Sequence, residues 1–459
     1  MRLRATLLTA IAATLIASAP AEARKQPPPP VPAPAPQVAL PSSPNGVTVR
    51  YYYERRQYPQ IWFGARGGDE AIGQLLTILR RAPIDGMANG PQVAASVEAA
   101  VARAKATNDS MQVKAAELAM SAAWADYVQA IHRPAPEMHY GDPALNTGIP
   151  HPDRTLAMAE AAPSLAQHLL SVSSINPIYA QLRDAAIKSA AANGGRPSSK
   201  LLANLDRARI LPSAGKFILV NAAEQKLHMY DNWQEQGSMK VVVGKGSDPL
   251  YKSALQTPFV ASTIYYAVLN PYWHVPEHLV RKFAPAIAKQ GDAYLKSRGY
   301  QVIADFSEHP QILPSSSVDW KAVAASSSTN VLLRQLPGAS NSMGRMKFPF
   351  PNPQGIYLHD SPEKEYFLLA DRAKSNGCVR LEDYKKLANW LFNGNAPVAN
   401  GTDPEQHVAL PKGVPVYVTY LTEVPSSTGM TEFADKYRRD DVGLANLSTP
   451  SVATAGLPN

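Results

Sequence analysis

The sequence predicts an α+β protein of more than one domain, in which a helical N-terminal part precedes a mainly β C-terminal part. Apolar residues recur at helical spacing up to about residue 209. After Leu211 and Pro212 they fall instead in many short runs separated by Gly and Pro, as expected for strands and turns. The 459 residues are enough for two or three domains, and the 45% that are hydrophobic exclude a fully disordered chain.

The helical part is expected to span residues 47–209. Three segments carry the helical pattern most clearly, namely 69–81, 111–131 and 178–192. Large aromatic side chains are usually buried, so Trp62, Trp124 and Tyr127 are expected in the core of this part. No catalytic group of residues stands out in it.

The β-rich part is expected to span residues 213–440. Strands are predicted at 216–221, 225–230, 239–243, 265–269, 355–359 and 414–421, and the first two form a hairpin. Within this part, 277–299 has the pattern of a helical insertion. The Ser-rich stretch 305–330 is expected to be a mobile loop.

The two ends of the chain have compositions that do not predict a folded core. Residues 1–23 combine an N-terminal positive charge, a short apolar run and a small-x-small site, which is the pattern of a secretory signal peptide. An uncleaved membrane anchor is the alternative. Residues 24–46 form a Pro-rich linker, and 441–459 are expected to be a disordered tail.

Composition and motif spacing exclude several classes of function. The formal net charge is +8, but basic pairs such as Arg438-Arg439 are scattered, so nucleic acid is not an expected partner. No metal-binding spacing occurs, and the Gly244–Ser247 stretch lacks the spacing of a phosphate loop, so no cofactor or metal is expected. The single cysteine excludes an intramolecular disulfide, a Cys-based zinc site and a lipoprotein anchor.

The single cysteine, Cys378, lies in the segment Ser375-Asn376-Gly377-Cys378-Val379-Arg380. An exported unpaired thiol is either buried and inert or used in chemistry. Apolar residues from Leu381 onward recur at helical spacing, so Cys378 is expected just before a helix N-terminus. The helix dipole and Arg380 would then favour a thiolate, and backbone N–H groups of the turn could hold an oxyanion.

His359 is the histidine best placed to be the base of this cysteine. It ends a predicted strand, it lies 19 residues before Cys378, and Asp360 follows it. A histidine at a strand end is more often structural, so the spacing alone is weak. The cysteine in the same segment makes a Cys–His pair the favoured interpretation.

The segment from His359 to Arg380 resembles the signature of the L,D-transpeptidases, the YkuD-type cysteine enzymes of the bacterial cell wall. Two further blocks resemble its YcbB-like branch: 270–276, and 334–338 with Asn341, Gly344, Lys347 and Phe348. The resemblance covers roughly 216–440 and is fainter over 50–209. It implies a scaffold domain followed by an L,D-transpeptidase catalytic domain, in which the insertion 277–330 is a lid.

The resemblance also implies roles for individual residues. Cys378 would be the nucleophile and His359 its base, with the main-chain carbonyl of Asp360 orienting the imidazole. The N–H groups of Gly377 and Cys378 would hold the oxyanion, and Arg380 would support the cysteine loop or the substrate.

Other positions of the motif also take their interpretation from the family. Ser375 fits the family pattern, whereas Asn376 stands where most members carry His, which leaves the local hydrogen bonding open. The resemblance implies substrate contacts for Tyr357, Trp273 and Asn341.

The implied activity is the formation of 3→3 cross-links between peptidoglycan stem peptides through a Cys378 thioester. A cysteine hydrolase on the same fold, either an L,D-carboxypeptidase or an amidase that releases wall proteins, is the alternative. A non-catalytic wall-binding protein is disfavoured by the intact Cys378 and His359. The protein is expected to be a periplasmic, wall-associated monomer that meets the membrane only if residues 1–23 stay uncleaved. No peptidoglycan-binding module is evident.

Overall fold

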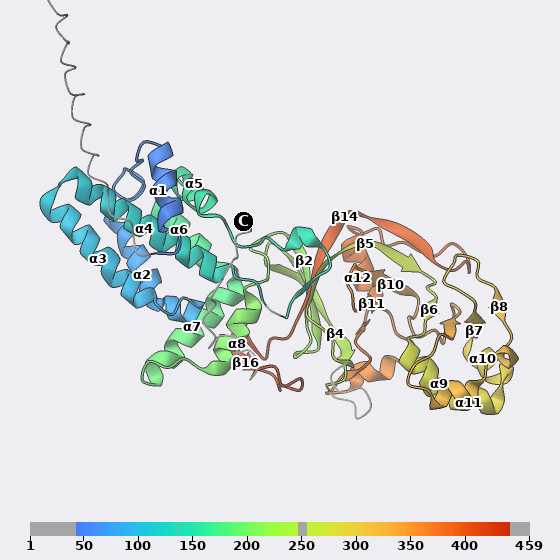
Figure 1. The fold of residues 1–459 in the computed structure, drawn as a ribbon. Helices are drawn as coiled ribbons and strands as arrows, with labels where there is room; N and C mark the ends of the chain where they lie inside the picture. Colours follow the sequence, from blue (N-terminus) through green and yellow to red (C-terminus); the bar gives the residue numbers. More distant parts are fainter. Residues whose placement is uncertain (1–42, 136, 247–254, 441–459) are drawn as a thin grey trace, which may run out of the picture. The chain divides into compact units, whose positions relative to one another are not determined.

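The computed structural model describes residues 43–135, 137–246 and 255–440 (Figure 1). The chain divides into two units, Met1–Ala39 and Leu40–Asn459, and the described residues belong to the second. The predicted signal peptide 1–23, nearly all of the linker 24–46 and the tail 441–459 lie outside the described residues. No described helix is long and apolar enough to cross a membrane.

The N-terminal part is helical, as predicted. Its helices are α1 (Gly46–Arg55), α2 (Asp69–Asp85), α3 (Gly90–Thr107), α4 (Ser110–Ile131), α5 (Pro152–Ala161), α6 (Leu165–Ser174), α7 (Pro177–Ala192) and α8 (Ser199–Ala208). Helix α4 begins where the Asp109 side chain accepts a hydrogen bond from the Gln112 N–H, an N-cap. Trp62, Trp124 and Tyr127 are fully buried, which confirms their predicted place in the core.

The C-terminal part is built on one sheet that closes on itself. Its strands are β2 (Lys216–Asn221), β3 (Lys226–Asp231), β4 (Gln234–Gly244), β5 (Val260–Leu269), β10 (Met346–Pro349), β11 (Tyr357–His359), β13 (Val379–Leu381) and β14 (Gln406–Thr419). They pair in the order β5-β10-β11-β13-β4-β3-β2-β14, and β14 pairs with β5 again. Two short strands, β1 (His139–Tyr140) and β12 (Ala373–Ser375), add to β5 and β4. All six predicted strands are present, including the β2–β3 hairpin.

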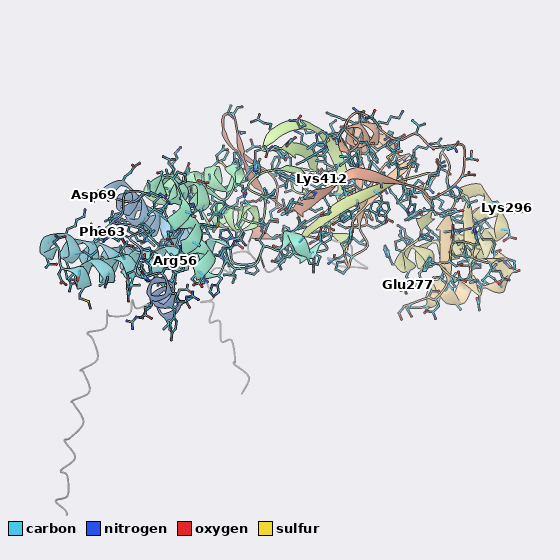
Figure 2. All side chains as sticks on the ribbon, turned by 90° about the horizontal axis from the view of Figure 1, so that it is seen from above. Arg56, Phe63, Asp69, Glu277, Lys296 and Lys412 are labelled. Atoms are coloured by element: carbon cyan, nitrogen blue, oxygen red, sulfur yellow. The ribbon has the colours of Figure 1, made fainter. Side chains whose placement is uncertain are left out.

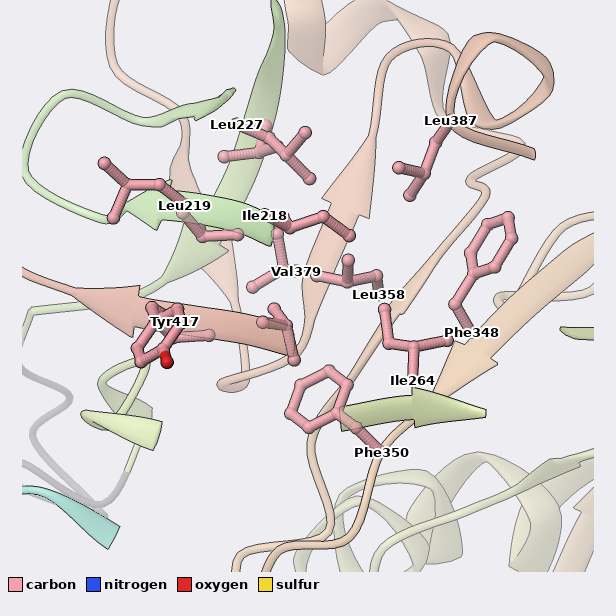
Figure 3. Packing of buried hydrophobic residues seen from close by; sticks show 14 of the residues in the cluster. Ile218, Leu219, Leu227, Ile264, Phe348, Phe350, Leu358, Val379, Leu387 and Tyr417 are labelled. Carbon is pink, nitrogen blue, oxygen red and sulfur yellow. The ribbon is translucent and has the colours of Figure 1, made fainter. Parts of the chain in front are cut away.

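Buried aliphatic and aromatic side chains from these strands form the main core (Figure 3). Leu358 of β11 and Val379 of β13 lie within it and are fully buried. Helix α12 (Tyr384–Leu391) adds Leu387 to the same core. The charged Lys412 is exposed at the irregularity in the pairing of β14 with β5 (Figure 2).

Between β5 and β10 the chain forms an insertion with a core of its own. Its elements are β6 (Trp273–His274), α9 (Glu277–Gln290), α10 (Asp292–Arg298), β7 (Tyr300–Ile303), β8 (Ile312–Leu313), η3 (Ser315–Ser317), α11 (Trp320–Ala325) and β9 (Leu332–Gln335). The predicted helix 277–299 is two helices that meet at Gly291. The prediction of a loop over 305–330 is wrong in part, because Trp320 is buried and starts α11.

The end of the described chain returns to the helical part. After β14 the hairpin of β15 (Glu423–Ser426) and β16 (Gly429–Glu432) follows. Leu421 packs in one buried cluster with residues of α7 and α8, such as Tyr179 and Leu205. The α8 residue Arg207 donates hydrogen bonds to the main-chain carbonyls of Tyr420 and Arg439.

Candidate active site

The parallel pairing of β11 with β13 brings the histidine and cysteine segments side by side. Leu358 lies opposite Val379, and His359 lies opposite Arg380. Side chains alternate between the two faces of a sheet, and Leu358 and Val379 point into the core. His359 and Arg380 therefore point to the opposite face, whereas Cys378 lies directly before β13 and packs against the main core. Strand spacing and rise put the Cα atoms of His359 and Cys378 about 8 Å apart, within reach of two side chains directed at each other.

His359 is held as a neutral imidazole in one tautomer. Its side chain is almost fully buried, and its Nδ1 lies 2.6 Å from the main-chain oxygen of Asp360. A carbonyl oxygen can only accept, so Nδ1 carries the proton and Nε2 keeps a free lone pair. Burial, and secondly the charge of Arg380, lower the pKa of His359 to about 3, against the effect of the Asp360 hydrogen bond. The imidazole is thus in its neutral form at neutral pH, with the Nε2 lone pair available to a proton donor.

The residue that orients His359 is itself held firmly. The carboxylate of Asp360 accepts a hydrogen bond of 2.9 Å from the Arg345 N–H and forms an ion pair with Lys364 at 2.8 Å. Asp360 is buried, so these contacts compensate the desolvation of its charge. The carbonyl that accepts the hydrogen bond from His359 Nδ1 therefore has a defined position.

Cys378 is a thiol in this setting. Its side chain is partly buried, and burial raises the pKa of the thiol to about 11, although the Tyr357 backbone and Arg380 act in the other direction. The expected position before a helix N-terminus is wrong. Cys378 is followed by strand β13, and α12 begins only at Tyr384. The helix dipole is therefore too far from the sulfur to favour a thiolate.

Ser375 and Gly377 shape the loop that carries the cysteine. The Ser375 hydroxyl donates to the Cys378 carbonyl over 2.6 Å and accepts from the Gly377 N–H over 3.1 Å. Gly377 has φ of +119°, a conformation that residues with a Cβ resist. Because the Gly377 N–H already has an acceptor, its expected part in the oxyanion site is not supported. The Cys378 N–H is left as the main candidate.

Arg380 and Asn376 lie on either side of the nucleophile. The Arg380 guanidinium forms an ion pair with Glu363 and lies 5.5 Å from the centre of the Tyr366 ring. It therefore ties β13 to the segment that follows His359. The Asn376 side chain is exposed and makes no hydrogen bond within the described ranges, so nothing in the loop depends on its amide.

Only one of the three proposed substrate-contacting residues lies beside the Cys–His pair. The Tyr357 ring centre lies 5.9 Å from that of His359, and burial raises the pKa of the Tyr357 hydroxyl. Trp273 is buried in the core of the insertion next to Tyr300. Asn341 is fully buried and satisfied by main-chain groups, three carbonyl acceptors and the Met343 N–H. The structure therefore gives Trp273 and Asn341 structural roles.

Glu405 and Lys347 form a further polar pair next to His359, and no sequence pattern indicated either role. Lys347 of β10 lies directly opposite His359, and its ammonium binds the Glu405 carboxylate at 3.0 Å. The same carboxylate accepts a hydrogen bond of 2.6 Å from the Tyr272 N–H. Glu405 lies in an irregular stretch before β14, so no periodicity could have indicated it.

Two family models match the chain. The L,D-transpeptidase catalytic domain, YkuD, matches residues 215–418, and the Scaffold domain matches residues 47–185. A curated Haemophilus influenzae protein, named as a candidate L,D-transpeptidase, is 27% identical over 262 residues. That match covers 55% of this chain and 50% of the relative, so the chain spans about half the length of this relative.

Two solved structures are similar over part of the chain. One is the Ldtfm–avibactam carbamoyl enzyme, 13% identical with a TM-score of 0.22, covering 46% of this chain and 50% of that one. The other is an L,D-transpeptidase from Xylanimonas cellulosilytica, 15% identical with a TM-score of 0.20, covering 52% and 79%. Scores this low carry no argument, and the assignment depends on the sequence matches. By these matches the chain contains a Scaffold domain over residues 47–185, followed by a YkuD-type L,D-transpeptidase catalytic domain over residues 215–418.

Proposed function

We propose that the protein is a periplasmic, wall-associated L,D-transpeptidase that forms 3→3 cross-links between peptidoglycan stem peptides. The observation that carries this proposal is the neutral His359, fixed by the Asp360 carbonyl in strand β11, which pairs with the strand that directly follows Cys378. This arrangement suits proton transfer from sulfur to Nε2 as the sulfur attacks an amide.

The proposed reaction has two steps. Cys378 Sγ attacks the carbonyl of the third residue of a donor stem peptide, and His359 Nε2 takes the thiol proton. The resulting imidazolium gives this proton to the departing amine of D-Ala, which leaves a thioester. The amine of a second stem peptide then attacks the thioester, loses a proton to His359 and regenerates the thiol. No cofactor takes part.

The insertion is proposed as the lid of this site. It joins the sheet through β5 and β10, and Lys347 of β10 lies opposite the catalytic histidine. A lid over residues 277–330 would keep water from the thioester and so favour the amine acceptor. The protein is proposed to act as a monomer on acidic stem peptides, whose negative charge is opposite in sign to its net charge of +8.

The proposal is tested by incubating the full chain with a purified disaccharide tetrapeptide and identifying the products by mass spectrometry. The expected product is a cross-linked dimer with loss of D-Ala, absent for the Cys378→Ala variant. Formation of tripeptide without dimer would identify a hydrolase instead, and turnover by Cys378→Ala would refute the proposed nucleophile.

A further inference from the structure

Behind the cysteine loop, Thr257, Gly244 and Tyr437 form a closed ring of hydrogen bonds. The Tyr437 hydroxyl donates to the Gly244 carbonyl over 2.5 Å, and the Gly244 N–H donates to the Thr257 hydroxyl over 2.8 Å. The Thr257 N–H completes the ring by donating to the Tyr437 hydroxyl over 3.4 Å. All three residues are buried, so no water competes for these groups.

One bond leads from this ring to the nucleophile. The Thr257 hydroxyl, which accepts from Gly244, donates its own proton to the Gly377 carbonyl over 2.9 Å. A Cβ on Gly244 would lie 2.1 Å from the Leu255 carbonyl oxygen, so the end of β4 and the Thr257 segment are in close contact. The position of the Thr257 hydroxyl is therefore narrowly defined.

The direction of the Gly377 carbonyl determines the direction of the Cys378 N–H. The two groups belong to one peptide unit, and no cis peptide occurs among the described residues. In a planar trans peptide the C=O and N–H bonds point in opposite directions. A hydroxyl that holds the carbonyl on the Thr257 side therefore directs the Cys378 N–H to the other side. Rotation of this peptide unit would turn the N–H away.

The C-terminal segment 433–440 holds Tyr437 in place. The Tyr437 ring stacks on Tyr420 with centres 4.7 Å apart, and its N–H donates to the Tyr420 hydroxyl over 2.9 Å. Arg439 extends this support, because its guanidinium donates to the Gln256 side chain next to Thr257 over 3.0 Å. Arg207 of α8 binds the Arg439 carbonyl and, at 2.7 Å, Asp440. The helical domain thus contributes to the support of the cysteine loop.

We propose that Thr257, supported by Tyr437 of the C-terminal segment, is a positioning residue that directs the Cys378 N–H at the oxyanion formed during acyl transfer. This inference rests on the proposed function, in which Cys378 attacks an acyl carbonyl. Among the described residues, the Thr257 hydroxyl is the group that donates a hydrogen bond to the Gly377 carbonyl.

Two reagents separate oxyanion positioning from a general effect on the loop. Acylation of Cys378 by p-nitrophenyl acetate passes through a tetrahedral oxyanion, whereas alkylation by iodoacetamide does not. Thr257→Val keeps the shape of the side chain and removes both hydrogen bonds of the hydroxyl. We expect it to slow acylation at least ~10-fold, at the lower end of what loss of an oxyanion donor causes, and to leave alkylation within about 3-fold. Intact mass reports both reactions, because Cys378 is the single thiol.

Matched variants complete the test. Thr257→Ser retains the hydroxyl and should restore acylation to within about 3-fold of wild type, whereas Tyr437→Phe should slow acylation with little effect on alkylation. Tyr53→Phe is the control, since Tyr53 is also a buried tyrosine whose hydroxyl has two partners, Glu117 and Ser121, but lies in the helical domain. It should react as wild type does.

Two outcomes would overturn the inference. One is equal acylation rates for Thr257→Val and wild type, and the other is an equal loss of acylation and alkylation in Thr257→Val. Failure of the wild type to react with the stem tetrapeptide, together with the expected pattern for p-nitrophenyl acetate, would refute the proposed function and leave the positioning role intact.

Discussion

Acidification from pH 7 to pH 5 should destabilise the protein through His359. The pKa of this residue is about 3 in the folded protein and 6.5 as the ordinary value, which applies to the unfolded chain. Its folded pKa is lowered, so its contribution to stability is present above pH 6.5 and is lost as the pH falls toward 3. Proton binding by the unfolded chain alone then costs about 2 kcal/mol of unfolding free energy between pH 7 and pH 5. Because His359 is 2% exposed, solvent screening reduces this value little.

Urea unfolding at both pH values measures this effect in wild type and in His359→Gln, which cannot take up a proton. On acidification, the unfolding free energy of the wild type should fall by about 2 kcal/mol more than that of the variant. Exchange of the exposed His139 for glutamine is the matched control and should leave the pH dependence of the wild type unchanged. An equal fall in unfolding free energy in wild type and His359→Gln would show that the imidazole is not buried in its neutral form.

Four further predictions follow from the site. His359→Ala should lower cross-linking turnover at least ~10²-fold with an unchanged circular dichroism spectrum, and near-normal turnover would point to another base. The rate of Cys378 alkylation by iodoacetamide should still rise between pH 9 and pH 11, since burial raises the pKa of the thiol to about 11; a plateau near pH 7 would contradict this. Asn376→His should change turnover by less than ~10-fold, because the exposed amide makes no contact in the loop; a large gain would mean that a histidine is needed there for proton transfer. Asn341→Ala should lower the unfolding free energy by about 2–4 kcal/mol, because it leaves buried carbonyls without donors, and an unchanged urea midpoint would contradict its structural role.

The hairpin and the helices could be predicted from the sequence because their hydrophobic patterns are local. Strand β2 has the predicted bounds 216–221, and it is a β-rich run next to turn residues. Strand β13 was missed because it has only three residues, Val379–Leu381, and the stronger helical pattern of α12 follows it. The alternation of apolar Val379, charged Arg380 and apolar Leu381 was the sequence signal that could have found it.

The chemistry of the site could be predicted from the sequence only in part. His359 and Cys378 could be named from residue types and motif, but their protonation states depend on burial that packing creates. The support of the cysteine loop joins Thr257, Gly377 and Tyr437, which are far apart in the sequence. Composition also misled at 305–330, where serines favour a loop but Trp320 is buried and its indole N–H binds the Ser315 carbonyl.

The attachment of the insertion has a consequence for folding and for sequence variation. Its ends meet at the paired residues Leu269 of β5 and Met346 of β10, which belong to the closed sheet. Strand pairing outside the insertion therefore already offsets the entropy lost in closing this long loop. This entropy cost grows only slowly with loop length. Residues 270–345 can thus be lengthened, shortened or exchanged without a change of strand register. Under the proposed function, this segment is where donor and acceptor preference can change while the sheet and Cys378 stay the same.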